Sequence, residues 1–229
     1  MLVEGDMANI VVLGAGIGGM SVAYELREKL GADHTVTVIG EGGLFSFTPS
    51  NPWVAVGWRN PGDIQVDAAQ ALGRKGIAFH PDGAERVIPQ ENALLLRSGR
   101  RIDYDYLVIA TGVAANFFGI PGAEEFSMPL YRRSQSLRLR DKLFTELEDT
   151  AVNNDDRYLR IIVVGGGPTG VETAGALAEM RNYDMPVTYP ELDPKKIEIT
   201  LVEMGPSVLG PFHEDLREYA QKSLQTGES

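Results

Sequence analysis

The chain has 229 residues, of which 43% are hydrophobic and 23% charged, a balance typical of a folded globular protein rather than a disordered one. Its formal net charge of −11 argues against a nucleic-acid partner, which needs a basic face, and against binding of these residues to an anionic membrane surface. The absence of cysteine excludes disulfides and thiolate catalysis, and the three histidines lie too far apart in sequence to indicate a metal site.

The opening segment predicts a βαβ unit. An apolar run of strand length, Asn9–Leu13, is followed by a glycine-rich loop, a helical pattern over residues 20–30 and a second strand pattern over Thr35–Ile39. The loop reads Gly14-Ala15-Gly16-Ile17-Gly18-Gly19.

The middle of the chain has a different pattern. Strand patterns over Ala84–Ile88 and residues 93–97 flank a turn and predict a small β-meander. A buried strand over residues 107–110 follows, and after a proline-containing linker a charged helix is expected over residues 134–150. We therefore expect two domains, which comprise residues 7–119 and residues 120–229.

The βαβ pattern returns in the second of these domains. Leu159–Val164 and Ile197–Val202 have strand patterns, and residues 171–180 are expected to be helical. A polar, proline-containing insertion over residues 181–196 precedes the returning strand. The loop after the first strand again has regularly spaced glycines and reads Gly165-Gly166-Gly167-Pro168-Thr169-Gly170.

Glycine-rich loops in this setting can bind the diphosphate of a dinucleotide, because a helix start offers unpaired N–H groups and a partial positive charge. We expect Gly14 to make the tight turn, Gly16 to let the backbone approach the diphosphate, and Gly19 to let the helix pack closely on the strand. The corresponding residues of the second loop are Gly165, Gly167 and Gly170. A glycine-rich turn without a ligand is the alternative, but both loops join an apolar strand to a helix, which favours two binding sites.

A carboxylate at the end of the second strand of each unit would bind the adenosine ribose. Glu203 directly follows Ile197–Val202 and would repel a 2′-phosphate, which favours NAD over NADP. In the first unit the strand is followed by Gly40, so we expect Glu41 to take this role. Two dinucleotide sites in one chain indicate a hydride relay, in which one nucleotide delivers a hydride and a flavin accepts it.

These motifs resemble those of the two-dinucleotide-binding-domain flavoproteins, the pyridine nucleotide–disulfide reductase superfamily. The resemblance implies an α/β fold of FAD/NAD(P)-binding Rossmann-like, three-layer domains with a central parallel sheet and a small β-meander. It implies that the first loop binds FAD and that the second binds NAD(H). It also implies that Ala110, Thr111 and Gly112 lie close to the FAD, and that Glu172, two residues after Gly170, is a candidate catalytic residue near the nicotinamide.

The chain resembles two branches of this superfamily. Residues 47–58 are similar to a stretch that runs near the flavin ring in sulfide:quinone reductases, and Pro49 is expected to shape the turn beneath that ring. The second glycine loop and residues 202–209 are similar to type II NADH:quinone oxidoreductases. Sulfide:quinone reductases use paired cysteines, and this chain has none. We therefore favour hydride transfer from NADH to flavin and on to a quinone.

Three alternatives stay open: a sulfide:quinone reductase-like flavoprotein without the usual cysteines, a non-catalytic nucleotide-binding or redox-sensing module, and an NAD-dependent dehydrogenase without flavin. Superfamily members are roughly one domain longer than this chain, so we expect a C-terminally truncated fragment. The expected missing part includes the returning half of the FAD domain and a C-terminal segment that docks on membranes. The resemblance thus implies a cytoplasmic protein, peripheral on the cytoplasmic membrane through that segment, and leaves a homodimer open.

Overall fold

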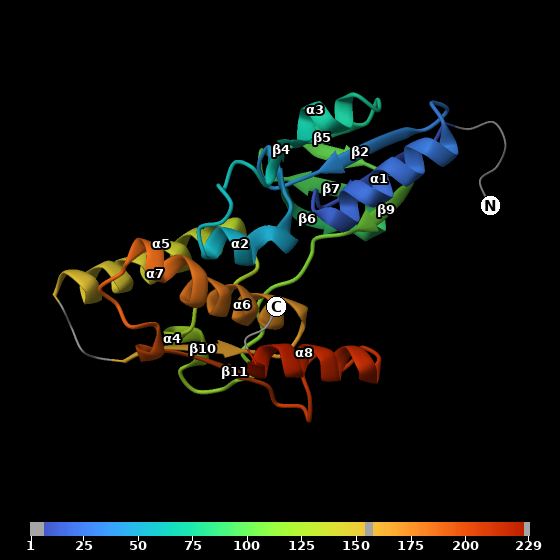
Figure 1. Cartoon of the computed structure of the whole chain (residues 1–229). Coiled ribbons are helices and arrows are strands. Elements are labelled where there is room, and N and C mark those ends of the chain that lie inside the picture. The colour runs from blue at the N-terminus through green and yellow to red at the C-terminus, as the bar shows by residue number, and fades with distance from the viewer. Residues whose placement is uncertain (1–6, 154–157, 227–229) are drawn as a thin grey trace. The chain divides into compact units, whose positions relative to one another are not determined.

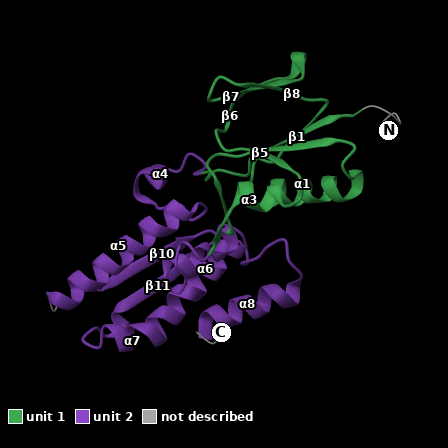
Figure 2. Ribbon diagram, turned by 90° about the horizontal axis from the view of Figure 1, so that it is seen from above, with its two compact units in different colours: residues 1–47, 64–116 green, residues 48–63, 117–229 purple. Residues whose placement is uncertain are grey.

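The computed structural model describes residues 7–153 and 158–226, which fall into two compact units (Figures 1 and 2). Unit 1 comprises residues 1–47 and 64–116, and unit 2 comprises residues 48–63 and 117–229. The expected domains, residues 7–119 and residues 120–229, remain a prediction. Residues 48–63 belong to unit 2 although they interrupt unit 1 in sequence, which the colours of Figure 2 make visible.

Unit 1 is built on a four-stranded parallel sheet, as expected. The strand order is β5 (Ala78–His80), β2 (Thr35–Ile39), β1 (Asn9–Leu13) and β9 (Tyr106–Ile109). Strand β1 pairs with β2 from Asn9 opposite Thr35 to Leu13 opposite Ile39, and helix α1 (Ile17–Leu30) joins the two strands. A second helix, α3 (Ala68–Gly73), precedes β5. The central position of β1 places the loop that follows it at the middle of the sheet edge.

The sheet of unit 1 has helices on one face and an antiparallel meander on the other. The meander consists of β6 (Ala84–Ile88), β7 (Ala93–Leu96) and β8 (Arg101–Asp103). Successive side chains of a strand point to opposite faces. Val12 of β1 packs with residues of α1 and α3, whereas Val11 and Leu13 pack with Leu94 and Leu96 of β7. This alternation produces the expected three layers and the expected β-meander.

Residues 48–63 leave unit 1 between two strands that pair with each other. Strand β3 (Leu44–Ser46) is antiparallel to β4 (Gln65–Asp67), with Leu44 opposite Asp67. Just outside this pair, the N–H of Phe47 donates to the carbonyl of Ile64. The pairing brings the two ends of this insertion together within unit 1, and the residues between them pack in unit 2.

Unit 2 contains a parallel strand pair and several helices (Figure 1). The pair is β10 (Leu159–Val164) with β11 (Ile197–Val202), in register from Leu159 opposite Ile197 to Val164 opposite Val202. Its helices are α2 (Asn51–Ala55), preceded by a 3₁₀ turn (Thr48–Ser50), then α4 (Ala123–Phe126), α5 (Arg133–Val152), α6 (Pro168–Glu179), α7 (Met185–Thr188) and α8 (Glu214–Thr226).

The stretch expected as a polar insertion over residues 181–196 is more ordered than its composition indicates. A π-helical turn, Met180–Asp184, continues α6, and α7 follows directly. Met180 and Met185 are each only 2% exposed and belong to the same apolar cluster as Leu177. Burial of these two methionines explains the extra helical structure, because packing of apolar side chains stabilises helices more than intrinsic preference does.

The core of unit 2 lies on one face of the strand pair. Leu159, Ile161 and Val163 of β10 pack on a cluster that includes Leu143 and Leu147 of α5. The alternate residues of β10, such as Ile162 and Val164, are exposed. The apolar pattern of the strand is therefore used on one face only, in the part of the chain that the structure describes.

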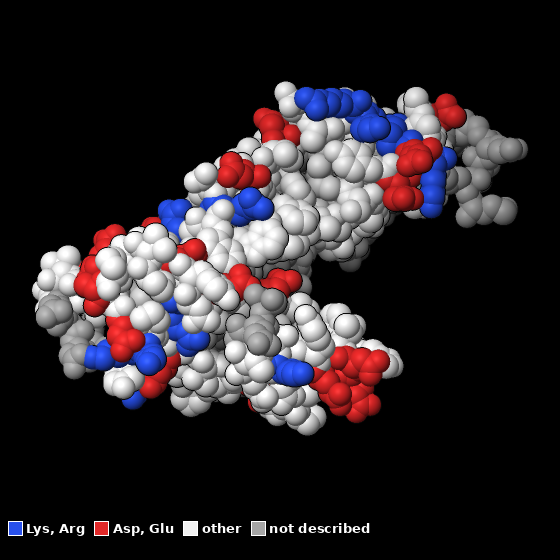
Figure 3. All heavy atoms as spheres, viewed as in Figure 1, with Lys and Arg blue, Asp and Glu red and all other residues white. Residues whose placement is uncertain are grey.

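Charged side chains of both signs are spread over the surface, and acidic ones gather on α8, at Glu214, Asp215 and Glu218 (Figure 3). Within residues 7–153 and 158–226, none of the helices combines the length and apolar character that a membrane span requires.

Candidate functional site

The first glycine turn lies between β1 and α1 and packs against the end of β9. Gly14 has a φ of +117°, which favours glycine, and its N–H donates to the carbonyl of Ile39 at 2.7 Å. A Cβ atom added to Gly14 would lie 2.1 Å from the carbonyl oxygen of Ala110. The structure therefore brings Ala110 directly against the glycine turn, and it supports the expectation that Gly14 makes a tight turn.

The second turn, between β10 and α6, has the same construction. Gly165 has a φ of +107° and donates to the carbonyl of Val202 at 2.8 Å. A Cβ atom added to Gly19 or to Gly170 would come within 1.8 Å of the carbonyl oxygen of Gly14 or Gly165, respectively. Both helices thus approach the preceding turn so closely that only glycine fits, as expected for the last glycine of each loop.

The starts of α1 and α6 are open to a ligand. A Cβ atom added to Gly16, Gly18 or Gly167 would meet no atom within 4 Å. Neither helix has a side-chain cap or an acidic residue in its first turn. The unpaired N–H groups and the positive end of each helix dipole are therefore uncovered. These features fit a diphosphate.

The two helix starts differ in the number of N–H donors that they offer. Helix α1 begins with Ile17 and Gly18, which both retain an N–H group, whereas α6 begins with Pro168, which has none. Proline is favoured at this position because its fixed φ suits the first helical turn. At the start of α6, Gly167, Thr169 and Gly170 are the residues with N–H groups near the predicted diphosphate position.

Glu203 lies next to the second loop, where it was expected. Its carboxylate accepts hydrogen bonds from the N–H of Gly205 at 2.7 Å and from the N–H of Gly166 at 2.5 Å. The N–H of Gly205, followed by that of Gly166, lowers the pKa of Glu203 below its ordinary value. The carboxylate is therefore ionised at neutral pH and stands at the edge of the loop. Its contact with a ribose remains a prediction.

Glu41 has a different environment. Its carboxylate forms an ion pair with Arg97, at the end of the meander strand β7, and residue 41 forms a β-bridge with Asp82. Sequence reasoning missed Arg97, because 56 residues separate it from Glu41 and no motif links them. The ribose role expected for Glu41 remains a prediction, in which Arg97 would compete with the ribose for the carboxylate.

The other residues expected near the cofactors lie as follows. Thr111 and Gly112 continue the chain beyond Ala110, and Gly112 has a φ of +79°. Pro49 is exposed in the 3₁₀ turn before α2 and belongs to unit 2. Glu172 is exposed on α6, two residues after the second glycine loop. Their expected places near the flavin and the nicotinamide remain predictions.

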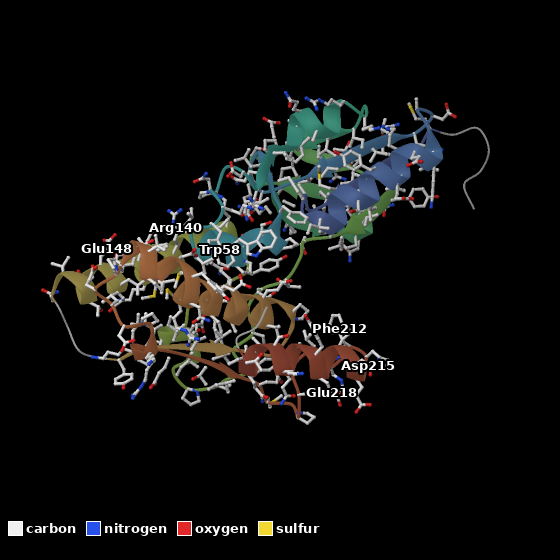
Figure 4. The ribbon with its side chains drawn as sticks, viewed as in Figure 1. Trp58, Arg140, Glu148, Phe212, Asp215 and Glu218 are labelled. Carbon is white, nitrogen blue, oxygen red and sulfur yellow. The ribbon has the colours of Figure 1, made fainter. Side chains whose placement is uncertain are left out.

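The tryptophan-containing residues 48–63 are fixed by polar contacts within unit 2. The indole N–H of Trp58 donates to a carboxylate oxygen of Asp184 at 2.5 Å (Trp58 is labelled in Figure 4), and the guanidinium of Arg59 lies 5.4 Å from the ring centre of Trp53. Asn51 is 1% exposed, and its Nδ2 donates to the carbonyl of Tyr131 at 2.5 Å. None of these contacts has a signal in the sequence.

Two strand–turn–helix units, each with a glycine turn and an uncovered helix start, define an α/β protein of the dinucleotide-binding class. The family model for pyridine nucleotide-disulphide oxidoreductases matches residues 8–227. The chain therefore belongs to that family.

Curated relatives come from both branches that the sequence resembles. The sulfide-quinone reductase of Aquifex aeolicus is 41% identical over 135 residues, which cover 59% of this chain and 31% of that protein. The external alternative NAD(P)H-ubiquinone oxidoreductase B2 of Arabidopsis thaliana mitochondria is 31% identical over 232 residues, which cover 94% of this chain and 39% of that protein. The chain thus spans less than half the length of these relatives.

The fold also agrees with a solved structure. NDH2 from Plasmodium falciparum, in complex with NADH, matches with a TM-score of 0.82 and 24% identity, over 97% of this chain and 47% of that one. At this level of identity the match shows the fold alone, which agrees with the expected α/β fold built on parallel strands.

Proposed function

We propose that this chain carries the dinucleotide-binding units of an FAD-dependent oxidoreductase that transfers a hydride from NADH to flavin and passes the electrons to a quinone. One observation supports this most directly: the chain contains two helix starts of the same construction, both uncovered, each behind a glycine turn. The names of relatives that match over more than nine-tenths of the chain, NAD(P)H-ubiquinone oxidoreductases, agree with it.

In this proposal the start of α1 binds the diphosphate of FAD and the start of α6 that of NADH. The N–H groups of Ile17 and Gly18 in the first loop, and of Gly167 and Thr169 in the second, hold the phosphates. Gly14 and Gly165 keep the turns tight enough for that approach. The bound flavin and nicotinamide supply the hydride chemistry, and the protein positions them and excludes water. Glu172 is the candidate residue near the nicotinamide, and Glu203 the one at its adenosine ribose.

Absorption spectroscopy tests this proposal. The chain, purified and incubated with FAD, should retain a flavin spectrum after gel filtration. NADH should bleach the visible band under anaerobic conditions, and a soluble quinone should restore it. A retained flavin that NADH does not bleach would refute the proposed donor. A bleached flavin that oxygen reoxidises but quinone does not would refute the proposed acceptor.

A second candidate function is a sulfide:quinone reductase-like activity. It is favoured by the 41% identity to the Aquifex aeolicus enzyme, the highest among the relatives named above. The chain has no cysteine pair that could form a disulfide for sulfide to attack, so this activity would need a different arrangement. Flavin reduction by sulfide but not by NADH, in the same anaerobic cuvette, would select this candidate.

We further propose a cytoplasmic protein, peripheral on the cytoplasmic membrane, with a quinone as its substrate and a homodimer as its assembly. The quinone is lipid-soluble, which gives peripheral contact a purpose. Sedimentation with vesicles and mass measurement in solution test these two points separately. A longer chain that carries the expected C-terminal segment but remains in the supernatant would contradict the first, and a monomeric mass at all concentrations the second.

A further inference from the structure

We propose that Glu203 is a positioning residue that braces the second glycine loop before any nucleotide binds, in addition to the ribose contact that the proposed function gives it. The inference rests on that function only for its ligand. Its structural basis is a set of hydrogen bonds within unit 2.

Gly166, in the middle of the loop, is held on both of its backbone polar groups. Its N–H donates to Glu203, and its carbonyl accepts from the N–H of Leu209 at 2.7 Å. The other carboxylate oxygen of Glu203 accepts from Gly205. Residues 203–209, the strand-end segment, thus contact the loop at two points. A hydrogen bond to a charged carboxylate is stronger than one between neutral groups, so Glu203 provides the firmer of the two contacts.

The strand-end segment is itself attached to α8. Arg217 donates from Nη1 to the hydroxyl of Ser207 at 3.2 Å. Leu209 has a φ of +54°, an uncommon conformation for a leucine, and its N–H is the group that bonds Gly166. The chain therefore adopts an unfavourable backbone angle where it reaches the loop. These contacts indicate that the segment is held in place rather than only lying nearby.

The loop and the strand end are in close contact in both units, but the glycine that permits this contact lies at a different place in each. A Cβ atom on Gly166 would lie 3.0 Å from the side chain of Glu203, so a glycine in the loop makes room for the carboxylate. In unit 1 the equivalent pair is Ala15 and Gly40, and a Cβ atom on Gly40 would lie 2.8 Å from that of Ala15. In unit 1 the glycine follows the strand, and in unit 2 it lies in the loop, where it leaves room for the carboxylate of Glu203.

Removal of the carboxylate of Glu203 changes ligand affinity in opposite directions with and without the brace. A negative charge beside a diphosphate repels it, so removing the charge alone should tighten binding of any ligand that lacks the ribose hydroxyls. If Glu203 also positions the loop, removing the carboxylate should weaken binding of such a ligand, because the N–H donors are no longer preorganised.

The experiment compares wild type, Glu203→Gln and the control Glu198→Gln. The control also removes one negative charge, from a carboxylate in β11 that pairs with Arg160 at 3.0 Å. Binding of NADH and of an analogue without the adenosine ribose hydroxyls is measured by fluorescence. We expect Glu203→Gln to weaken both ligands by roughly fivefold or more, and the control to change neither by more than about twofold. Unchanged or tighter binding of the analogue to Glu203→Gln would overturn the brace.

Amide hydrogen exchange in the ligand-free chain gives an independent readout. We expect slow exchange at Gly166 and Gly205 in wild type and in Glu198→Gln, and faster exchange at both in Glu203→Gln. Equal exchange in all three would overturn the brace even if the chain binds NADH. Failure of wild type to bind NADH would contradict the proposed function, while the exchange result would still decide whether the brace exists.

Discussion

The indole N–H of Trp58 donates a hydrogen bond to the carboxylate of Asp184, so the tryptophan-containing residues 48–63 are tied to the π-helical turn that ends α6. Residues Trp58 and Asp184 are 126 positions apart. This hydrogen bond places residues 48–63 in contact with the helical segment that begins at the second glycine loop. π-Helical turns often occur at functional positions.

A double-mutant cycle measures this link. Trp58→Phe and Asp184→Ala should each lower the free energy of unfolding by about 1 kcal/mol, since each removes one charge-assisted hydrogen bond. Because both remove the same bond, the double variant should lose less than the sum, with a coupling of about 0.5–1 kcal/mol. Denaturation in urea, followed by circular dichroism, checks this, and strictly additive losses would contradict the link.

Two glycines of α6 should respond oppositely to alanine. Gly170→Ala places a methyl group 1.8 Å from the carbonyl oxygen of Gly165, so we expect a loss of about 2 kcal/mol or more. Gly175→Ala meets no atom within 4 Å, so we expect a gain of about 0.5–1 kcal/mol from lower flexibility of the unfolded chain. Thermal unfolding compares the pair, and equal shifts would refute the close packing of α6 on its turn.

Much of the framework can be read from the sequence. Strands β1, β2, β10 and β11 have the bounds that their apolar runs predict. Each run has a clear end in the sequence, since a glycine follows three of them and a glutamate follows the fourth. The membership of residues 48–63 in unit 2 cannot be read in the same way, since it depends on contacts with α5 and α6.

The candidate site shows the same contrast. The glycine turns follow from local spacing and were predicted with their packing roles. The partner of Glu41 was not, because Arg97 comes from the meander, and ion pairs between distant segments leave no periodic signal. Glu203 was expected at the strand end as a ribose ligand, which remains a prediction, and its hydrogen bonds to Gly166 and Gly205 appear only in three dimensions.

Asn51 offers a test of buried polarity. Its Oδ1 is buried without a hydrogen-bond partner in the described structure, while its Nδ2 bonds Tyr131. Asn51→Leu should cost no more than about 1.5 kcal/mol, because it removes an unsatisfied group together with one hydrogen bond. Asn51→Asp should cost about 3 kcal/mol or more at neutral pH, because it buries a charge beside a carbonyl oxygen.

The two variants also differ in their pH dependence. Burial should raise the folded-state pKa of the carboxyl introduced at position 51 above its unfolded value, so the stability of Asn51→Asp should fall as pH rises through that range. Asn51→Leu should show the same profile as wild type. Parallel profiles for both variants, measured by denaturation across the acid range, would contradict the burial of this side chain.

Glu203 should have the opposite pH behaviour. Its folded-state pKa is lowered by the N–H groups of Gly205 and Gly166. A carboxyl of this kind adds stability above its unfolded-state pKa, and that stability is lost as pH falls through the folded-state pKa. Wild type should therefore lose more stability than Glu203→Gln when the pH is lowered from about 6 to about 3. Identical losses in the two proteins would contradict the hydrogen bonds.

Each helix start should bind one dinucleotide, and paired alanine variants test this most directly. Gly16→Ala and Gly167→Ala add a methyl group in open space, at φ angles of −81° and −74° that alanine accepts, so both chains should fold normally by circular dichroism. Titration of each variant with FAD and with NADH is the decisive measurement. We expect Gly16→Ala to weaken FAD binding at least about tenfold and to leave NADH within about twofold, and Gly167→Ala to do the reverse. Two folded variants that bind both ligands as wild type does, or that lose both equally, would contradict the assignment of one dinucleotide to each helix start.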